Sequence, residues 1–483
     1  MKRRASWAAA VLCGVLAAPA WGEEPAHEPV PPLIEALKTE RAEDRRLAEA
    51  QLLKAGDDAI VPLSQALEKA DPKFKPVFED VLSRLVAHWA SAAWEWRHAQ
   101  GPPIEANFAR LSALFQTWPA AAQKSFWSAL PPEQRKFPPD YKDTCIAARL
   151  GLIEPIEATT LEIKIDGSGV YTRHLEIARW IRLMQAAAQA SRAAEGEDIA
   201  KDEPLKMDEE VRGLNETFFP NDPGKCSIKP APADKDVMEA AIKAGVLELA
   251  IAFPTLADLD ACLQSVPEPF CVSFVLTVGP NNRILVQRKR VWPTKKMYGM
   301  EHLFLDGRRE RFTLKSEIPV RRVTAPKTEN GESVWDGSVW DLLNTDAVAF
   351  ELSVKALPAA KEPKGRTAVP PLKRIPDDAT GRIAYEPAPP DRYVLMQLNS
   401  TEPRERRGAA WVLLDEARRP FQASETAARA ARRLEVGAAL AAALEQEEDF
   451  RAYLLMHAAL SAWSGEERSY AEPEAWGKIF LKK

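Results

Sequence analysis

The sequence is poor in the residues and motifs that build reactive sites. Its 483 residues include five cysteines and six histidines, and no two histidines have the HExxH spacing or another metal-binding spacing. A GxSxG nucleophile elbow, a phosphate-binding P-loop and a GxGxxG turn after a strand are all absent. We therefore predict no catalytic residue, no cofactor and no metal ligand.

Long apolar runs and an excess of charge of one sign are missing too. Beyond residue 22, no stretch is apolar enough to span a bilayer, so we predict no transmembrane segment in the mature chain. The formal net charge is −5, from 65 basic and 70 acidic residues. This balance gives no general attraction to nucleic acid or membranes, and we predict no nucleic-acid partner.

What the chain does have at its start is the pattern of a secretory signal peptide at residues 1–22. A basic stretch (2–4) precedes an apolar run (7–18), and Ala20 and Gly22 place small residues at the cleavage positions before Glu23. A bulky leucine stands before the cysteine of this run, which favours cleavage over a lipoprotein anchor, the alternative. We expect an exported protein, periplasmic or secreted, with a flexible lead at residues 23–32.

Cleavage of the predicted signal peptide leaves four cysteines, which are Cys145, Cys226, Cys262 and Cys271. An even number in an oxidising compartment is typical of up to two disulfides, with three connectivities. Cys262 and Cys271 are close in sequence, and this is the pair that we predict first. Four buried free thiols are the alternative.

Residues 33–150 have the apolar spacing of short helices, with stops at Gly56 and at Asp71-Pro72. Helices this short cannot bury an apolar face alone, so they stack on neighbours. The segment resembles a HEAT repeat in its order of an apolar helix, small residues at Ala48 and Ala50, Leu53, Gly56 and then 60–63. The resemblance implies a helical scaffold for protein contacts and no particular activity.

A period of two replaces the helical period in residues 151–357. Leu161, Ile163 and Ile165 alternate with polar residues before an Asp166-Gly167 turn, and residues 348–354 alternate in the same way. We predict a central antiparallel β module, with residues 320–332 irregular and a turn at Asp336-Gly337. An acidic insertion at 195–216 lacks EF-hand spacing, and we interpret it as a solvated loop.

This module resembles the LppM-type domain of exported bacterial proteins. The resemblance is carried by the strand before Asp166–Gly169 and by Ile318-Pro319, Asn330-Gly331, Val339-Trp340 and 348–354 near the end. The chain departs from the family through the insertions between Tyr171 and Ser227. The resemblance implies a β-structured envelope domain, linked in some relatives to lipid or glycolipid handling, and it implies no catalytic residues.

Residues 358–390 are rich in proline and charge without a sustained period, and we predict a linker. Helical spacing returns in residues 391–483, which resemble HEAT-type helix pairs more loosely. The predicted fold class is therefore a multidomain α+β protein. Its central β module is flanked by HEAT-like helical segments.

One segment has a strong local charge. From Arg283 to Arg322 there are twelve Lys/Arg against four Asp/Glu, a local charge of +8. The candidate anion-binding residues on these hairpins are Arg288, Arg290, Lys295, Lys296, Arg308, Arg309 and Arg311. The alternative is a solvated sheet face that balances the acidic insertion.

These patterns favour a non-catalytic exported scaffold or binding protein of the cell envelope, which uses its helical repeats to contact an envelope protein partner. Binding of anionic lipid or glycan through the basic hairpins is the alternative. An envelope hydrolase is a remote alternative, because carboxylates are abundant but no motif selects a catalytic pair.

Overall fold

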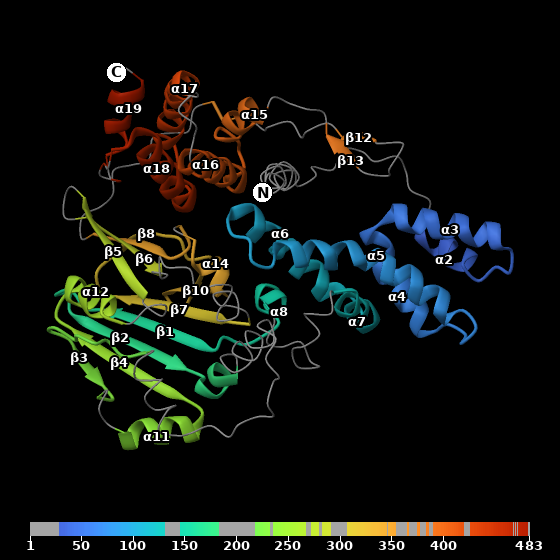
Figure 1. Cartoon of the computed structure of the whole chain (residues 1–483), viewed down its shortest axis with the longest axis horizontal. Coiled ribbons are helices and arrows are strands. Elements are labelled where there is room, and N and C mark those ends of the chain that lie inside the picture. Colours follow the sequence, from blue (N-terminus) through green and yellow to red (C-terminus); the bar gives the residue numbers. More distant parts are fainter. Residues whose placement is uncertain are drawn as a thin grey trace. The chain divides into compact units, whose positions relative to one another are not determined.

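A computed structural model of the protein has helices at both ends of the chain and β-sheets between them (Figure 1), which confirms the predicted α+β class. The residues that the structure describes are 29–130, 145–182, 218–231, 235–266, 272–279, 283–290, 307–344, 346–353, 365–366, 374–376, 383–385, 390–419, 426–466, 468, 470 and 472–481. The predicted signal peptide, the acidic insertion 195–216 and most of the predicted linker lie outside them.

The chain forms two compact units. One comprises Ala18–Gln100 and Ile104–Glu154, and the other comprises Met1–Ala17, Gly101–Pro103 and Pro155–Lys483. The predicted C-terminal helical domain thus shares a unit with the β module.

The first unit is built from consecutive helices. They are α2 (Val30–Ala36), α3 (Ala42–Ala55), α4 (Asp57–Glu68), α5 (Lys75–Trp96), α6 (Pro102–Thr117, all but its first two residues), α7 (Ala120–Ala129) and α8 (Cys145–Arg149). Helix α2 packs on α3 and α4, α3 on α5, and α4 on α5 and α7. Each helix therefore buries its apolar face against close neighbours in the chain, as the helical periodicity predicts.

Local sequence explains where these helices stop and what they bury. Gly56 separates α3 from α4 at a φ of 63°, a conformation that glycine adopts without strain. Near the end of the unit, the ring of Phe115 lies 5.4 Å from Phe126 and 5.7 Å from Trp127, both edge-on. These aromatic residues pack against one another within the unit.

Two sheets form the β module. The seven-stranded sheet has the order β3-β4-β2-β1-β7-β10-β9, with β3 (Ser227–Lys229), β4 (Leu247–Phe253), β2 (Gly169–Leu175), β1 (Glu157–Ile163), β7 (Arg309–Ser316), β10 (Glu332–Ser338) and β9 (Lys327–Glu329). The four-stranded sheet has the order β5-β6-β11-β8, with β5 (Val272–Gly279), β6 (Arg283–Arg290), β11 (Ala349–Leu352) and β8 (Val320–Val323).

The first hairpin forms where the sequence predicts it. Strands β1 and β2 pair antiparallel, and the Ser168 backbone N–H and hydroxyl both donate to Asp166 Oδ1, at 3.0 and 2.7 Å. Gly169 has no room for a side chain, since a Cβ there would lie 1.9 Å from the carbonyl oxygen of Glu162. The turn thereby fixes the register of the two strands.

Three details of the module differ from the prediction. The seven-stranded sheet is mixed, because β1 pairs in parallel with β7. Asp336 and Gly337 do not form a turn but lie within β10, opposite β7. The chain changes direction after β10 instead. There the Ser338 hydroxyl accepts the Asp341 N–H at 3.2 Å and caps the first turn of α14 (Val339–Leu342). The segment predicted to be irregular contains strands β8 and β9.

The inner faces of the two sheets enclose one hydrophobic core. Leu161, Ile251 and Phe312 from the larger sheet and Phe274 and Val286 from the smaller one belong to it. Two further helices accompany the sheets, α11 (Lys235–Ala244) and α12 (Leu256–Gln264), and α12 is capped by Thr255 as predicted.

Strand β11 is buried on both faces. Phe350 and Leu352 lie in the core between the sheets, while Ala349, with Leu285 of β6, belongs to the core of the C-terminal helices. Those helices are α15 (Pro390–Gln397), α16 (Pro403–Arg418), α17 (Thr426–Leu444), α18 (Phe450–Ser464) and α19 (Glu474–Phe480), and a small β12 (Arg374–Pro376) and β13 (Ile383–Tyr385) pair precedes them. The alternating pattern predicted one solvent-facing side for this strand, and the helices cover that side.

Phe350 at the centre of this arrangement provides a test of the fold. Replacing Phe350 by Ala should lower the free energy of unfolding by about 3–5 kcal/mol, because it removes a fully buried ring and leaves a cavity. Urea denaturation followed by tryptophan fluorescence would measure the loss. Val278→Ala is the control, because Val278 on β5 is 70% exposed and its truncation should change stability by less than about 0.5 kcal/mol. Equal effects of the two substitutions would contradict this burial.

Candidate functional site

The structure describes four of the seven predicted anion-binding side chains. Arg288 and Arg308 are buried, and Arg309 and Arg311 are partly buried. The side chain of Arg290 lies outside the described residues, as do Lys295 and Lys296. The pairing of the four described arginines therefore decides how much of the basic segment can face an external anion.

The register of β1 and β7 places two carboxylates side by side inside the module, since Glu157 lies opposite Glu310 in the parallel pair. Arg173 on β2 donates from Nε and Nη2 to Glu157 Oε1 at 3.0 and 2.7 Å. Arg308 reaches the other oxygen of Glu157, with Nη2 3.3 Å from Oε2. Glu157 is thus held between two arginines, and all three side chains are buried.

Arg288 of the smaller sheet completes this buried ionic cluster. Its Nη2 forms an ion pair with Glu310 Oε1, and its guanidinium carbon lies 5.1 Å from the centre of the Phe312 ring. Thr159 on β1 donates to the same oxygen of Glu310 at 3.5 Å. The cluster thus joins the facing sheets through charged groups within a largely apolar core.

Burial and neighbouring charges shift the pKa values of the arginines in this cluster. Burial lowers the pKa of Arg288 and of Arg308, and Glu157 opposes that effect at Arg308. For Arg173, burial also works to lower the pKa, but Glu157 and Tyr171 together outweigh it and the pKa is raised. Carboxylates held in this way by guanidinium groups accept hydrogen bonds from the fold itself, so the arrangement fits a structural role better than proton transfer.

The two remaining described arginines pair on the other face of β7. Arg309 Nη2 lies 2.5 Å from Asp336 Oδ1, and Arg311 pairs with Glu329. All four described arginines therefore have carboxylate partners within the sheets. For Arg290, Lys295 and Lys296, anion binding stays a prediction.

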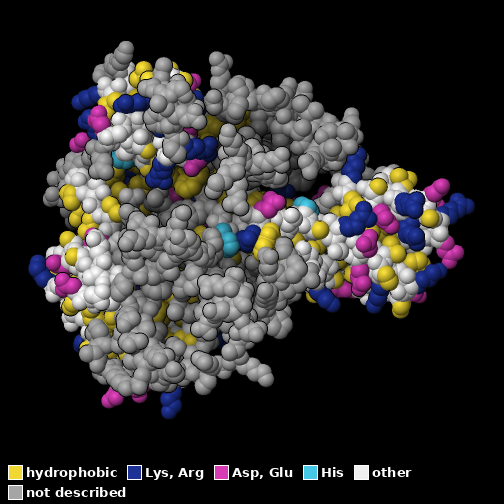
Figure 2. All heavy atoms as spheres, in the orientation of Figure 1, with side chains coloured by type: hydrophobic (Ala, Val, Ile, Leu, Met, Phe, Trp, Pro, Cys, Tyr) yellow, Lys and Arg dark blue, Asp and Glu magenta, His cyan; other side chains and the backbone are white. Residues whose placement is uncertain are grey.

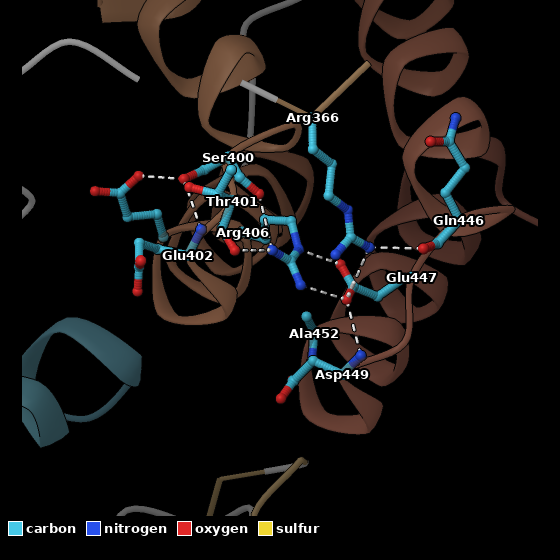
Figure 3. A network of polar contacts seen from close by, with 10 residues as sticks. Arg366, Ser400, Thr401, Glu402, Arg406, Gln446, Glu447, Asp449 and Ala452 are labelled. Carbon is cyan, nitrogen blue, oxygen red and sulfur yellow. Dashed lines mark hydrogen bonds and ion pairs between the residues drawn. The ribbon is translucent and has the colours of Figure 1, made fainter. Parts of the chain in front are cut away.

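Sequence reasoning missed a second ionic site in the C-terminal helices (Figure 3). The buried Arg406 of α16 binds Glu447 through two hydrogen bonds, Nε to Oε2 at 2.7 Å and Nη2 to Oε1 at 2.9 Å. Its Nη1 donates to the carbonyl oxygens of Ser400 and Thr401 at 2.8 and 2.9 Å. Arg366 donates to the carbonyl oxygen of Gln446 at 2.6 Å. This network ties the loop before α16 to the loop between α17 and α18. The sequence signal for it was a run of charged residues at the start of a helix whose other residues are largely apolar.

A third ionic site joins the β module to the C-terminal helices. Buried Asp346, just before β11, accepts hydrogen bonds from Arg407 of α16 at 2.6 Å and Arg451 of α18 at 2.8 Å. The guanidinium carbon of Arg322 on β8 lies 4.5 Å and 4.3 Å from the ring centres of Phe450 and Tyr453. Polar contacts therefore fix the position of the helices over an apolar sheet face.

The described cysteines, Cys145, Cys226 and Cys262, are all buried, and no disulfide joins any two of them. Cys145 donates to the carbonyl oxygen of Arg97 at 2.8 Å within the first unit. Cys262 lies beside Cys226 in the β module, whereas Cys271, its predicted first partner, lies outside the described residues. The fold thus brings together two cysteines that sequence distance did not favour.

Across the ranges that the structure describes, no three His, Cys, Asp or Glu side chains are grouped so as to hold a metal ion. Among those same residues, none of the helices has the length and apolar character needed to cross a membrane. Comparisons of the chain with protein-family models, with curated proteins and with solved structures found no match. No enzyme family is therefore indicated, and a function has to be argued from the geometry.

The Arg288–Glu310 pair provides a test of the buried cluster. Arg288→Met should lower the free energy of unfolding by about 3 kcal/mol or more, because a buried carboxylate loses its guanidinium. Arg311→Met is the matched control, since Arg311 and Glu329 are 39% and 42% exposed and the loss should stay below about 1 kcal/mol. Chemical denaturation of both variants checks this. The double variant Arg288→Met/Glu310→Gln should recover part of the loss, and an Arg288→Met protein as stable as Arg311→Met would contradict the assignment.

Tyr453, beside the third ionic site, predicts that the folded protein loses stability at alkaline pH. Burial raises the pKa of Tyr453 from 10.0 to about 12, although Arg322 and Arg283 act in the opposite direction. A raised folded-state pKa favours the neutral form, so this contribution is full below about pH 10 and is lost as pH rises towards 12. Tyr453→Phe should therefore reduce the fall in stability between pH 10 and 12 by about 2 kcal/mol. Urea midpoints across this range measure it, and an unchanged slope would count against the assignment.

Proposed function

We propose that the protein is an exported, non-catalytic scaffold of the bacterial cell envelope that binds a protein partner through its helical segments. The observation that carries this proposal is the exposure of α3 in the first unit. Only Ala48 and Leu52 of this helix are buried, and Leu47 is 60% exposed. The exposed side chain of Leu47 gives a partner an apolar point of contact among the charged residues of this helix.

The surface of the first unit fits this role. Figure 2 shows basic, acidic and hydrophobic side chains interspersed over the region of α2 to α4. Both signs of charge are present there, whereas a field of one sign would favour a polyanion. The resemblance to HEAT repeats supports the same function, since such repeats present consecutive helices to their partners.

The buried ionic sites support a role without catalysis. The carboxylates of the β module that sequence reasoning left open for a hydrolytic pair include Glu157 and Glu310, and both are bound by arginines of the module. In a catalytic pair the substrate lies between the two carboxyl groups. Guanidinium groups lie beside Glu157 and Glu310 instead, so these carboxylates do not fit that arrangement.

The alternative, binding of anionic lipid or glycan, has less support because the four described arginines of the basic segment face carboxylates of the module itself. It would depend on Arg290, Lys295 and Lys296. Retention on vesicles containing phosphatidylglycerol that is lost in a Lys295→Glu/Lys296→Glu variant would move the proposal to this alternative.

Chemical crosslinking in an envelope fraction tests the scaffold proposal. The wild-type protein should capture a defined partner, and Leu47→Asp should reduce capture at least tenfold, since an aspartate would have to be desolvated at the contact. Leu434→Asp is the matched control, because Leu434 of α17 is 61% exposed in the other unit and its replacement should leave capture unchanged. Equal capture by wild type and Leu47→Asp would reject α3 as the contact, and no capture at all would reject the proposal.

A further inference from the structure

Two thiols lie side by side in the β module. Cys226 stands immediately before β3, and Cys262 lies on α12. Both belong to the core between the sheets, with 9% of Cys226 and 1% of Cys262 exposed. Their side chains lie next to each other in this core.

Polar contacts hold the two segments together on either side of this pair. The Ser265 hydroxyl, just after α12, donates to the carbonyl oxygen of Asp222 at 2.9 Å and accepts the Asp222 N–H at 3.0 Å. On the other side, Lys225 Nζ lies 3.2 Å from Asp258 Oδ1, and Cys226 Sγ donates to the carbonyl oxygen of Asp258 at 3.5 Å. The folded chain therefore presents the two sulfur atoms to each other before any bond forms.

We propose that Cys226 and Cys262 form a disulfide bond when the protein meets a disulfide donor in the compartment to which it is exported. This pairing differs from the Cys262–Cys271 pair that sequence distance favours. The geometry selects it because Cys226 Sγ contacts α12 at Asp258, one helical turn before Cys262, and both cysteines belong to the same core.

The reaction is a thiol–disulfide exchange with a donor that is itself a disulfide, such as an oxidised dithiol protein. The Cys226 thiolate attacks one donor sulfur, and the S–S bond of the donor breaks to give a mixed disulfide and one donor thiol. Cys262 then loses its proton and attacks Cys226 Sγ, which expels the second donor sulfur as a thiol. The two cysteines lose two electrons and two protons, and the donor gains them.

The order of attack follows from exposure and acidity. Burial raises the pKa of both thiols and brings that of Cys262 to about 12, so its thiolate is scarce at neutral pH. Cys226 is also the more exposed of the two. A donor therefore reacts first at Cys226, and Cys262 completes the bond inside the core.

The bond would secure an edge of the larger sheet. Strand β3 is three residues long, lies at the end of the sheet and pairs only with β4. A link from Cys226 to α12 encloses β4 within a covalent loop, which restricts the unfolded chain and so stabilises the folded one.

Peptide mapping of the exported full chain tests the pairing directly. Free thiols are blocked with N-ethylmaleimide under denaturing conditions, and the protein is cut with chymotrypsin without reduction. Cleavage after Leu263 and Phe270 separates Cys262 from Cys271, which trypsin would leave on one peptide. A peptide pair joining Cys226 to Cys262 is expected. Maleimide on both residues, or a Cys262–Cys271 linkage, would overturn the proposal.

Thermal unfolding gives a second measurement that does not depend on mapping. Reduction of the wild type should lower Tm by roughly 5 °C or more. Cys226→Ser and Cys226→Ser/Cys262→Ser should become insensitive to reductant, while Cys271→Ser should keep the full response. A response that survives in Cys226→Ser and disappears in Cys271→Ser would assign the bond to another pair and reject this one.

Discussion

The organisation of the larger unit depends on a strand that is buried on both faces. Strand β11 contributes Phe350 to the core between the sheets and Ala349 to the core of the C-terminal helices. A strand in this position has no face for water, so the helices are part of the fold of the β module and not an attached domain. Asp346 fixes that attachment through Arg407 and Arg451, because a buried carboxylate with two guanidinium partners has few equivalent positions.

Arginine is used throughout this unit to fix the relation between layers. Glu157 and Glu310 sit side by side on parallel strands, and arginines from β2, β6 and the start of β7 neutralise them. In the C-terminal helices, Arg406 joins two loops through Glu447 and two carbonyl oxygens. Apolar burial supplies most of the stability of such layers, while bidentate ionic contacts restrict their register. A basic segment can therefore belong to the interior of a protein.

Short-range features were predictable from sequence because they are set by neighbouring residues. The Asp166-Gly167 turn, the Thr255 cap and the alternation of Leu161 and Ile163 with polar residues all depend on positions within a few residues of one another. The parallel pairing of β1 with β7 could not be read, since Arg308 and Glu157 are 151 residues apart in the chain. Asp336-Gly337 has the chemistry of a turn, yet the pairing of β10 with β7 overrides it. The partners of the candidate anion-binding arginines were hidden in the same way. The basic residues were counted correctly from the sequence, but the carboxylates that pair with them lie on other strands.

The double burial of β11 has a consequence for the order in which the chain is made. Synthesis begins at the N-terminus, so both sheets are complete once residue 352 has been added, whereas α18 ends only at Ser464. During that interval the sheet face with Leu285 and Ala349 has no cover, and an uncovered sheet face is prone to association with other chains. Nascent chains that stop between these two points should therefore need a chaperone more than the finished protein does.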